Sequence, residues 1–87
     1  MKITRHRQFK KNFKTRISRN PKLVKKFEER LNLFVFDHKN PLLKDHQLTG
    51  DRKAYRAFSV TGDIRTVYKI EGKTVELYDI GTHNQVY

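Results

Sequence analysis

Cysteine is absent from this chain of 87 residues, and so is any long apolar run. Without cysteine the chain can form neither disulfides nor thiolate metal sites, and its four histidines lack the spacing of a metal-binding helix. No apolar run approaches the roughly 18 residues of a membrane span, and no signal-peptide stretch is found near the N-terminus. We therefore expect a soluble cytoplasmic protein with no structural metal, no cofactor and no membrane partner.

Acidic residues are also scarce, with 9 Asp and Glu against 20 Lys and Arg and a net charge of +11. The excess is uneven, because residues 1–30 carry 12 basic and 2 acidic side chains whereas residues 31–87 carry 8 and 7. On helices such an imbalance makes a cationic surface that binds phosphates with a strong dependence on salt. The partner is expected to be a polyanion or an acidic protein.

The spacing of apolar side chains in the first half predicts two helices in a single domain spanning residues 1–87. Phe9, Phe13 and Ile17 recur at helical spacing among lysines and arginines. A second helix is expected from about Pro21 to Asp37, because Asn20 is a typical cap and proline favours the first helical position. Both apolar stripes are expected to face the core.

The apolar period changes to two after a loop expected at residues 38–50. Three runs rich in β-forming residues follow, separated by hairpin signals, and Lys2 to Arg5 can add a short edge strand; the runs are Ala54 to Val60, Ile64 to Ile70 and Thr74 to Ile80. The order β-α-α-β-β-β predicts an α+β fold, with two N-terminal helices packed on one face of an antiparallel sheet of three to four strands.

The second hairpin gives a first estimate of which side chains face the helices. If Glu71-Gly72 is its two-residue loop, Tyr68 pairs with Val75, and Arg65 projects from the open face. The side chains then expected to face the helices are Ile64, Tyr68, Ile70, Val75 and Leu77. Keeping Phe58 inward in the first hairpin puts Ala57 and Ser59 on the open face, although a slip of one residue reverses this.

The segment Gly81 to Tyr87 puts a histidine and an aromatic just beyond the last predicted strand. Read with His46, Asp63 and Arg65, it suggests an acid-base site for RNA phosphodiester chemistry. Cleavage without a metal needs a base for the ribose 2'-OH, an acid for the leaving 5'-oxygen and a cation for the phosphorane. Histidine suits both proton roles because its unperturbed pKa of about 6.5 lies near working pH. Arginine can hold the phosphate, and Tyr87 can stack on a base.

The motifs resemble those of the YafQ-type branch of the RelE/ParE toxin superfamily. The resemblance rests on Lys44 to Gly50, Tyr55-Arg56, Gly62 to Tyr68, and Gly81-Thr82-His83 with Tyr87. It implies a RelE-like fold and a small toxin that cuts messenger RNA in the ribosomal decoding site, is neutralised by a cognate antitoxin, and is itself monomeric outside that complex. Carried over by motif, the residues implied as catalytic are His46, Asp63, Arg65, His83 and Tyr87. We expect further RNA contacts from Lys10, Lys11, Lys14, Lys53 and Arg56.

The sequence departs from the YafQ pattern at Ala57, where an acidic residue is usual, and at Ser59, where a second sheet histidine is usual. His46 and His83 are then the expected imidazole pair, while His6 and His38 are interpreted as solvated. Other interpretations of these residues stay open, because Asp63 could only stabilise its turn, Arg65 could pair with a side chain on the neighbouring strand, and Tyr87 could cover the edge of the core. Other functions stay open too: a non-catalytic ParE-like inhibitor of DNA gyrase, or a plain RNA- or ribosome-binding module.

Overall fold

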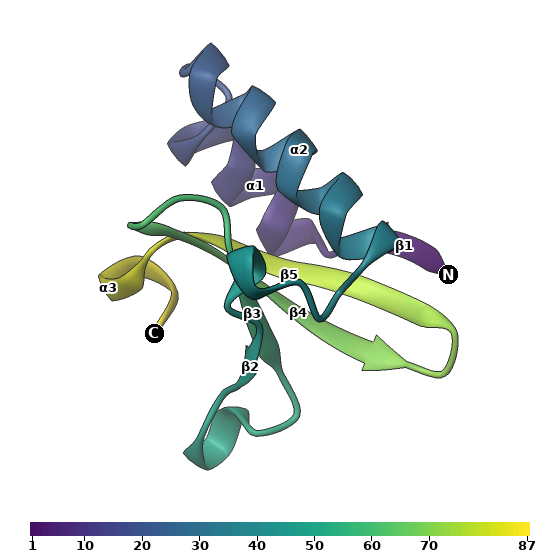
Figure 1. Cartoon of the computed structure of the whole chain (residues 1–87). Helices are drawn as coiled ribbons and strands as arrows, with labels where there is room; N and C mark the ends of the chain where they lie inside the picture. The colour runs from purple at the N-terminus through teal and green to yellow at the C-terminus, as the bar shows by residue number, and fades with distance from the viewer.

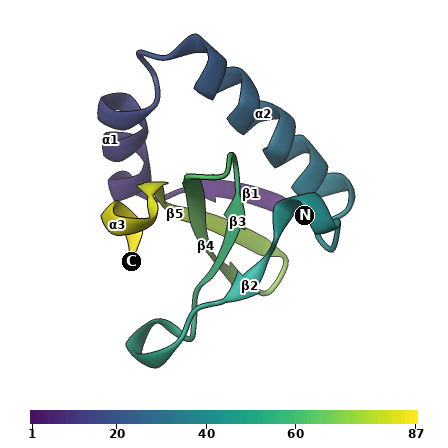
Figure 2. The same cartoon turned by 60° about the vertical axis from the view of Figure 1, so that its left-hand side comes forward.

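Two helices lie against one face of a five-stranded sheet in the computed structural model, which describes residues 1–87 (Figure 1 and Figure 2). The strands follow one another across the sheet as β1-β5-β4-β3-β2; β1 runs parallel to β5, and the other neighbours are antiparallel. The elements are β1 (Lys2–Arg5), α1 (Arg7–Arg16), α2 (Pro21–Phe36), η1 (Pro41–Leu43), β2 (His46–Gln47), η2 (Gly50–Arg52), β3 (Arg56–Ser59), β4 (Ile64–Glu71), β5 (Thr74–Thr82) and α3 (His83–Val86), where η marks a 3-10 turn. The predicted RelE-like α+β fold is confirmed, with a mixed sheet of five strands instead of an antiparallel one of three to four.

Both long helices begin at side-chain caps. The Asn20 side chain accepts hydrogen bonds from the amides of Lys22 and Leu23, as the Asn-Pro pair predicts. His6 was expected to be solvated, and this is wrong: its Nδ1 accepts from the Gln8 amide at 3.0 Å and caps α1, and its ring packs against Tyr78. None of the helices combines the length and apolar character needed to cross a membrane.

The predicted register of the second hairpin is wrong. Its loop is Gly72-Lys73, one residue further along, so Ile70 pairs with Val75 and Tyr68 with Leu77. Gly72 has a φ of +61°, a left-handed conformation that glycine adopts without steric cost, and this fixes the turn at that position. Beyond the turn a bulge in β5 shifts the register again. Ile70 pairs with the buried Val75 but lies next to the end of the hairpin, and 52% of its surface is exposed where an inward side chain was expected.

Apolar side chains gather on both faces of the sheet. Between the sheet and the helices lies the main core, which includes Phe9, Phe27, Phe34, Phe58 and Tyr68. On the opposite face a smaller cluster holds Leu48, Ala57, Val67 and Val86. The inward direction of Phe58 and the open-face position of Ala57 are therefore as the sequence predicts, and the open face is partly covered by the C-terminal segment.

Two features of the fold were absent from the sequence interpretation. Strand β2 forms within the expected loop by pairing His46 with Ala57 and Gln47 with Arg56. The chain then closes with the single-turn helix α3, which turns back along the sheet so that the C-terminus lies on the face away from α1 and α2 (Figure 1).

Candidate functional site

Helix α3 is held against the sheet by three contacts. The Gln85 side chain accepts the Thr82 amide at 2.8 Å and completes a capping box. The Arg52 guanidinium donates to the Val86 carbonyl, which ties α3 to η2. Val86 itself is buried in the open-face cluster. These contacts fix the backbone that carries His83 and Tyr87.

A cavity of about 490 Å³ lies between α3 and the β2–η2 segment. It brings together three of the five predicted catalytic residues, His46, His83 and Tyr87; the other lining residues are Gln47, Leu48, Thr49 and Arg52. The Tyr87 ring lies near both imidazoles, with its centroid 4.6 Å from that of His83 and 6.3 Å from that of His46. Both histidines are solvent-exposed, so a substrate can reach them from outside. Two residues 37 positions apart in sequence thus share one cavity.

Tyr87 contributes a buried hydroxyl that has no hydrogen-bond partner. Burial raises the pKa of this hydroxyl, and the positive charge of Arg65 partly offsets the effect. The hydroxyl is therefore protonated at neutral pH, and it has a proton available for donation to a bound group. An unpaired buried hydroxyl costs about 1–3 kcal/mol, so a ligand that accepts its hydrogen bond would recover part of this energy.

Arg65 is oriented by the turn between β3 and β4. Its Nη1 donates to the Thr61 carbonyl at 2.9 Å and to the Ser59 hydroxyl at 3.2 Å. Ser59 in turn donates to the same Thr61 carbonyl at 2.6 Å. The serine found where a histidine is usual therefore helps to hold the arginine, and the guanidinium is close enough to Tyr87 to influence its pKa.

Asp63 does not line the cavity. It is exposed in the turn before β4, where its amide donates to the Thr61 hydroxyl at 3.2 Å, and the same hydroxyl accepts the Ile64 amide at 3.0 Å. These bonds are turn chemistry of the kind that Gly-Asp sequences favour. A catalytic role for Asp63 remains a prediction.

The predicted RNA-binding residues occupy different parts of the molecule. Lys10, Lys11 and Lys14 are exposed on α1, and Lys53 is exposed after η2. Arg56 is different because its Nε forms an ion pair with the Asp45 carboxylate at 2.8 Å, on the wall of a second cavity. Only part of this guanidinium is left to contact RNA.

The sequence interpretation missed the other residues that line the cavity, above all Arg52. Nothing in its immediate sequence distinguishes Arg52 from the other basic residues. Its contact with Val86 joins residues 34 positions apart in the chain, which only the folded structure brings together. The signal for α3 was present, because Thr82 and Gln85 have the spacing of a capping box.

Comparison with known families decides what kind of protein carries this cavity. A family described as the bacterial toxin of type II toxin-antitoxin systems, YafQ, matches residues 1–87. The chain belongs to this family. A comparison with curated proteins finds no match.

Solved structures agree with the family. The chain is similar to YafQ from E. coli, with 25% identity and a TM-score of 0.82 over 98% of this chain and 96% of that one. It is also similar to the toxin in the crystal structure of the E. coli DinJ-YafQ complex, with 26% identity and a TM-score of 0.81 over 98% and 96% of the two chains. A metal-bound toxin from Helicobacter pylori is 27% identical, with a TM-score of 0.77 over 100% and 99%. In the present chain no three histidine, aspartate or glutamate side chains lie close enough together to hold a metal ion.

Proposed function

We propose that this YafQ-family toxin is an endoribonuclease that cleaves messenger RNA on the ribosome. The observation that supports this most strongly is the convergence of His46, His83 and Tyr87 on one open cavity. Arg65 is not among the residues that line this cavity, but its positive charge acts on the Tyr87 hydroxyl. Two imidazoles that line one cavity can provide the base and the acid that metal-free RNA cleavage needs. The DNA gyrase inhibitor and the plain binding module need neither group.

The proposed reaction uses the ribose 2'-OH as its nucleophile. One histidine removes the 2'-OH proton as the oxygen attacks phosphorus, and the other protonates the 5'-oxygen as its bond to phosphorus breaks. The products are a 2',3'-cyclic phosphate and a free 5'-hydroxyl. Arg65 stabilises the charge that develops on the phosphorane oxygens, and Tyr87 supplies its unpartnered hydroxyl or a stacking surface for a base. Asp63, exposed in the turn before β4, is assigned an orienting role.

The basic helices are proposed to dock the toxin on ribosomal RNA. Lys10, Lys11 and Lys14 are exposed on α1, away from the cavity, so they can bind phosphates without taking part in proton transfer. This division of roles would explain why the positive charge is concentrated in the first 30 residues, whereas the histidines of the cavity come from the second half. Lys53 and the free part of Arg56 would contact the message itself.

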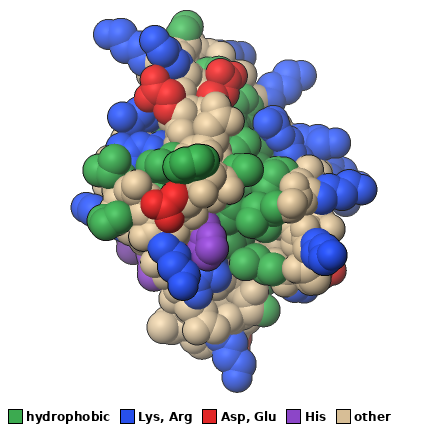
Figure 3. Space-filling model, turned by 45° about the vertical axis from the view of Figure 1, so that its right-hand side comes forward, with side chains coloured by type: hydrophobic (Ala, Val, Ile, Leu, Met, Phe, Trp, Pro, Cys, Tyr) green, Lys and Arg blue, Asp and Glu red, His purple; other side chains and the backbone are tan.

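A cognate antitoxin is the proposed protein partner, since a YafQ has been crystallised with DinJ. We expect an acidic segment of the antitoxin to cover the basic helices or the open sheet face, because the net charge of +11 attracts acidic chains. Figure 3 shows apolar side chains gathered at the centre of one face with lysines and arginines around them. Exposed apolar residues that such a segment could also cover include Phe36, Leu42 and Ile70. The toxin should be monomeric when the antitoxin is absent.

The proposal is tested by primer extension on a translated message after induced expression. New discrete 5' ends within codons are expected, and a message that is not translated should stay intact. Intact message together with DNA-damage signalling would instead support the gyrase inhibitor. Ribosome binding without cleavage would support the binding module. Purification with the protein encoded beside it tests the antitoxin, and the absence of a complex would contradict that part.

A further inference from the structure

Asp45, the residue before His46, is the acceptor at the centre of a partly buried polar network. Its side chain is only 8% exposed. One carboxylate oxygen accepts Arg56 Nε at 2.8 Å, and the other accepts a short hydrogen bond from the Tyr68 hydroxyl. Arg56 lies on β3, and Tyr68 is a core residue of β4. The carboxylate therefore attaches the start of β2 to two other strands.

This attachment matters because β2 has few bonds of its own. The strand is two residues long, at the edge of the sheet. Isolated edge pairs of this length are weak. Without Asp45, the position of His46 would depend on this short pairing.

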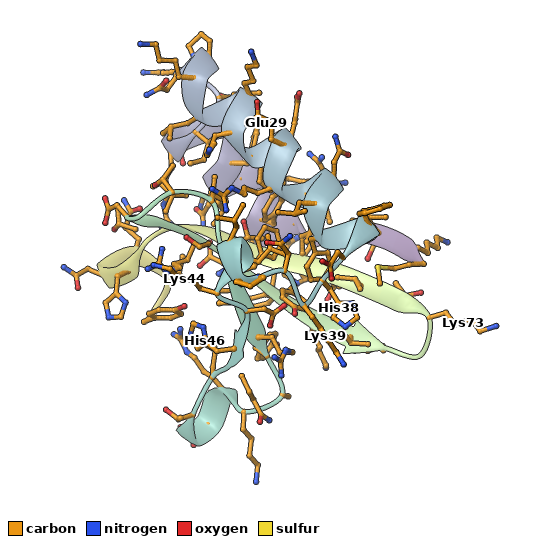
Figure 4. The ribbon with its side chains drawn as sticks, viewed as in Figure 1. Glu29, His38, Lys39, Lys44, His46 and Lys73 are labelled. Carbon is orange, nitrogen blue, oxygen red and sulfur yellow. The ribbon has the colours of Figure 1, made fainter.

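The residue on the other side of Asp45 is conformationally unusual. Lys44 has a φ of 47° and a ψ of 39°, and it is the only non-glycine residue with a positive φ. A left-handed conformation costs a lysine about 1–2 kcal/mol, and such strain persists only where its surroundings impose it. The Lys44 carbonyl meets Nδ1 of His46 at 3.0 Å. Figure 4 shows Lys44 and His46 on the same side of the β2–β3 hairpin, with His38 and Lys39 on the other.

We propose that Asp45, held by Arg56 and Tyr68, is a positioning residue that fixes His46 as the Nδ1–H tautomer with Nε2 free to act in the cavity. A carbonyl oxygen can only accept a hydrogen bond, so a neutral His46 must carry its proton on Nδ1. Its Nε2 then has the lone pair, which is the form that a general base requires. The inference assigns His46 the role of base, and in this respect it rests on the proposed function.

The direct test is the tautomer of His46, read from a long-range ¹⁵N–¹H correlation spectrum at a pH where the ring is neutral. The His46 signals are assigned by their loss in His46→Gln. The parent protein is expected to show mainly the Nδ1–H tautomer. In Tyr68→Phe and Asp45→Asn the population should shift toward the Nε2–H form that prevails in free histidine. A parent His46 that is mainly Nε2–H, or a tautomer unchanged in both variants, would overturn the inference.

The matched control is Asp79→Asn. Asp79 is also a nearly buried carboxylate with several partners, Gln8, Asn12 and Arg16, but these join α1 to β5 and leave β2 untouched. This variant should lose stability and keep the His46 tautomer. A tautomer shift of equal size in Asp79→Asn would mean that the spectrum reports a general loss of stability, and it would count against Asp45 as the positioning residue.

Cleavage provides a second readout. Tyr68→Phe keeps the buried ring, so the variant is expected to fold, and its rate on ribosome-bound message should fall about 10- to 100-fold from misplacement of the base. The two readouts separate the two claims. If the parent protein cleaves no RNA but has the Nδ1–H tautomer and loses it in the variants, the positioning of His46 by Asp45 stands and the proposed function fails. If cleavage is normal in Tyr68→Phe, the positioning role is contradicted.

Discussion

Gly81 occupies a position where one added methyl group should disturb the whole C-terminal segment. A Cβ at this residue would lie 2.6 Å from the Gln85 side-chain oxygen and 2.8 Å from Nη1 of Arg16. Both atoms are at the ends of flexible side chains, so they can move away. Each side chain breaks a hydrogen bond when it moves away. Gln85 caps α3 through the Thr82 amide, and Arg16 donates to the Ile80 carbonyl at 3.0 Å.

The size of the effect follows from these two bonds. Loss of a helix cap costs about 1 kcal/mol, and loss of a hydrogen bond from a partly exposed charged group costs about 1.5 kcal/mol. The lower conformational entropy of the unfolded alanine variant offsets this loss by about 0.5 kcal/mol. Gly81→Ala should therefore lower the free energy of unfolding by about 2 kcal/mol, which is about 8–16 °C in Tm for a domain of this size. Cleavage should fall about 100-fold, because α3 carries His83 and Tyr87.

Urea unfolding and a cleavage assay on ribosome-bound message measure both effects. Gly62→Ala is the matched control, since a Cβ there meets nothing within 4 Å and the backbone is not left-handed. It should keep both stability and activity. A Gly81→Ala protein as stable and as active as Gly62→Ala would refute the argument that this contact holds the tail.

Three further predictions concern docking, catalysis and pH. Replacing Lys10, Lys11 and Lys14 together by alanine should weaken ribosome binding and reduce the slope of log affinity against log salt by about three, one per phosphate contact; an unchanged slope would place docking elsewhere. Arg65→Ala should cleave about 10²–10³-fold more slowly with the same pH optimum, because it removes charge stabilisation and no proton transfer; a shifted optimum would contradict this. Burial, together with its hydrogen bond to a carboxylate, raises the pKa of Tyr68. Above pH of about 10 the unfolded tyrosine ionises while the folded one stays protonated, so the free energy of unfolding should fall with rising pH, and less steeply in Tyr68→Phe; equal slopes in urea titrations would disprove it.

Local patterns in the sequence were enough to predict the helices and the hairpins. Phe9, Phe13 and Ile17 recur at helical spacing, and the Asn20-Pro21 cap marks the start of the next helix. Both helices are therefore predicted by interactions between residues close together in sequence. The family resemblance supplied His46 and His83, which line one cavity in the structure. These features depend on residues close in sequence or on motif order.

The features that the sequence left undetermined depend on long-range packing. Alternating β residues fit the second hairpin in more than one register, and the choice is made by the left-handed Gly72 and by the bulge in β5. Strand β2 has no pattern of its own and exists because Ala57 and Asp45 attach it to the sheet. The role of Ser59 in holding Arg65 could not be read from the sequence, because it depends on the Thr61 carbonyl that both residues share.

The central claim is that the cavity between α3 and β2 is the centre of RNA cleavage, and His83 tests it most directly. The measurement is the single-turnover rate of cleavage of a ribosome-bound message by His83→Gln across the pH range, with the fold checked by circular dichroism. His83 is exposed and contributes little apolar burial, so the variant should fold. Its rate should fall about 10²–10⁴-fold with loss of one limb of the pH profile, whereas His38→Gln, an exposed histidine outside this cavity, should cleave at the parental rate. A folded His83→Gln protein that cleaves at the parental rate would contradict the claim.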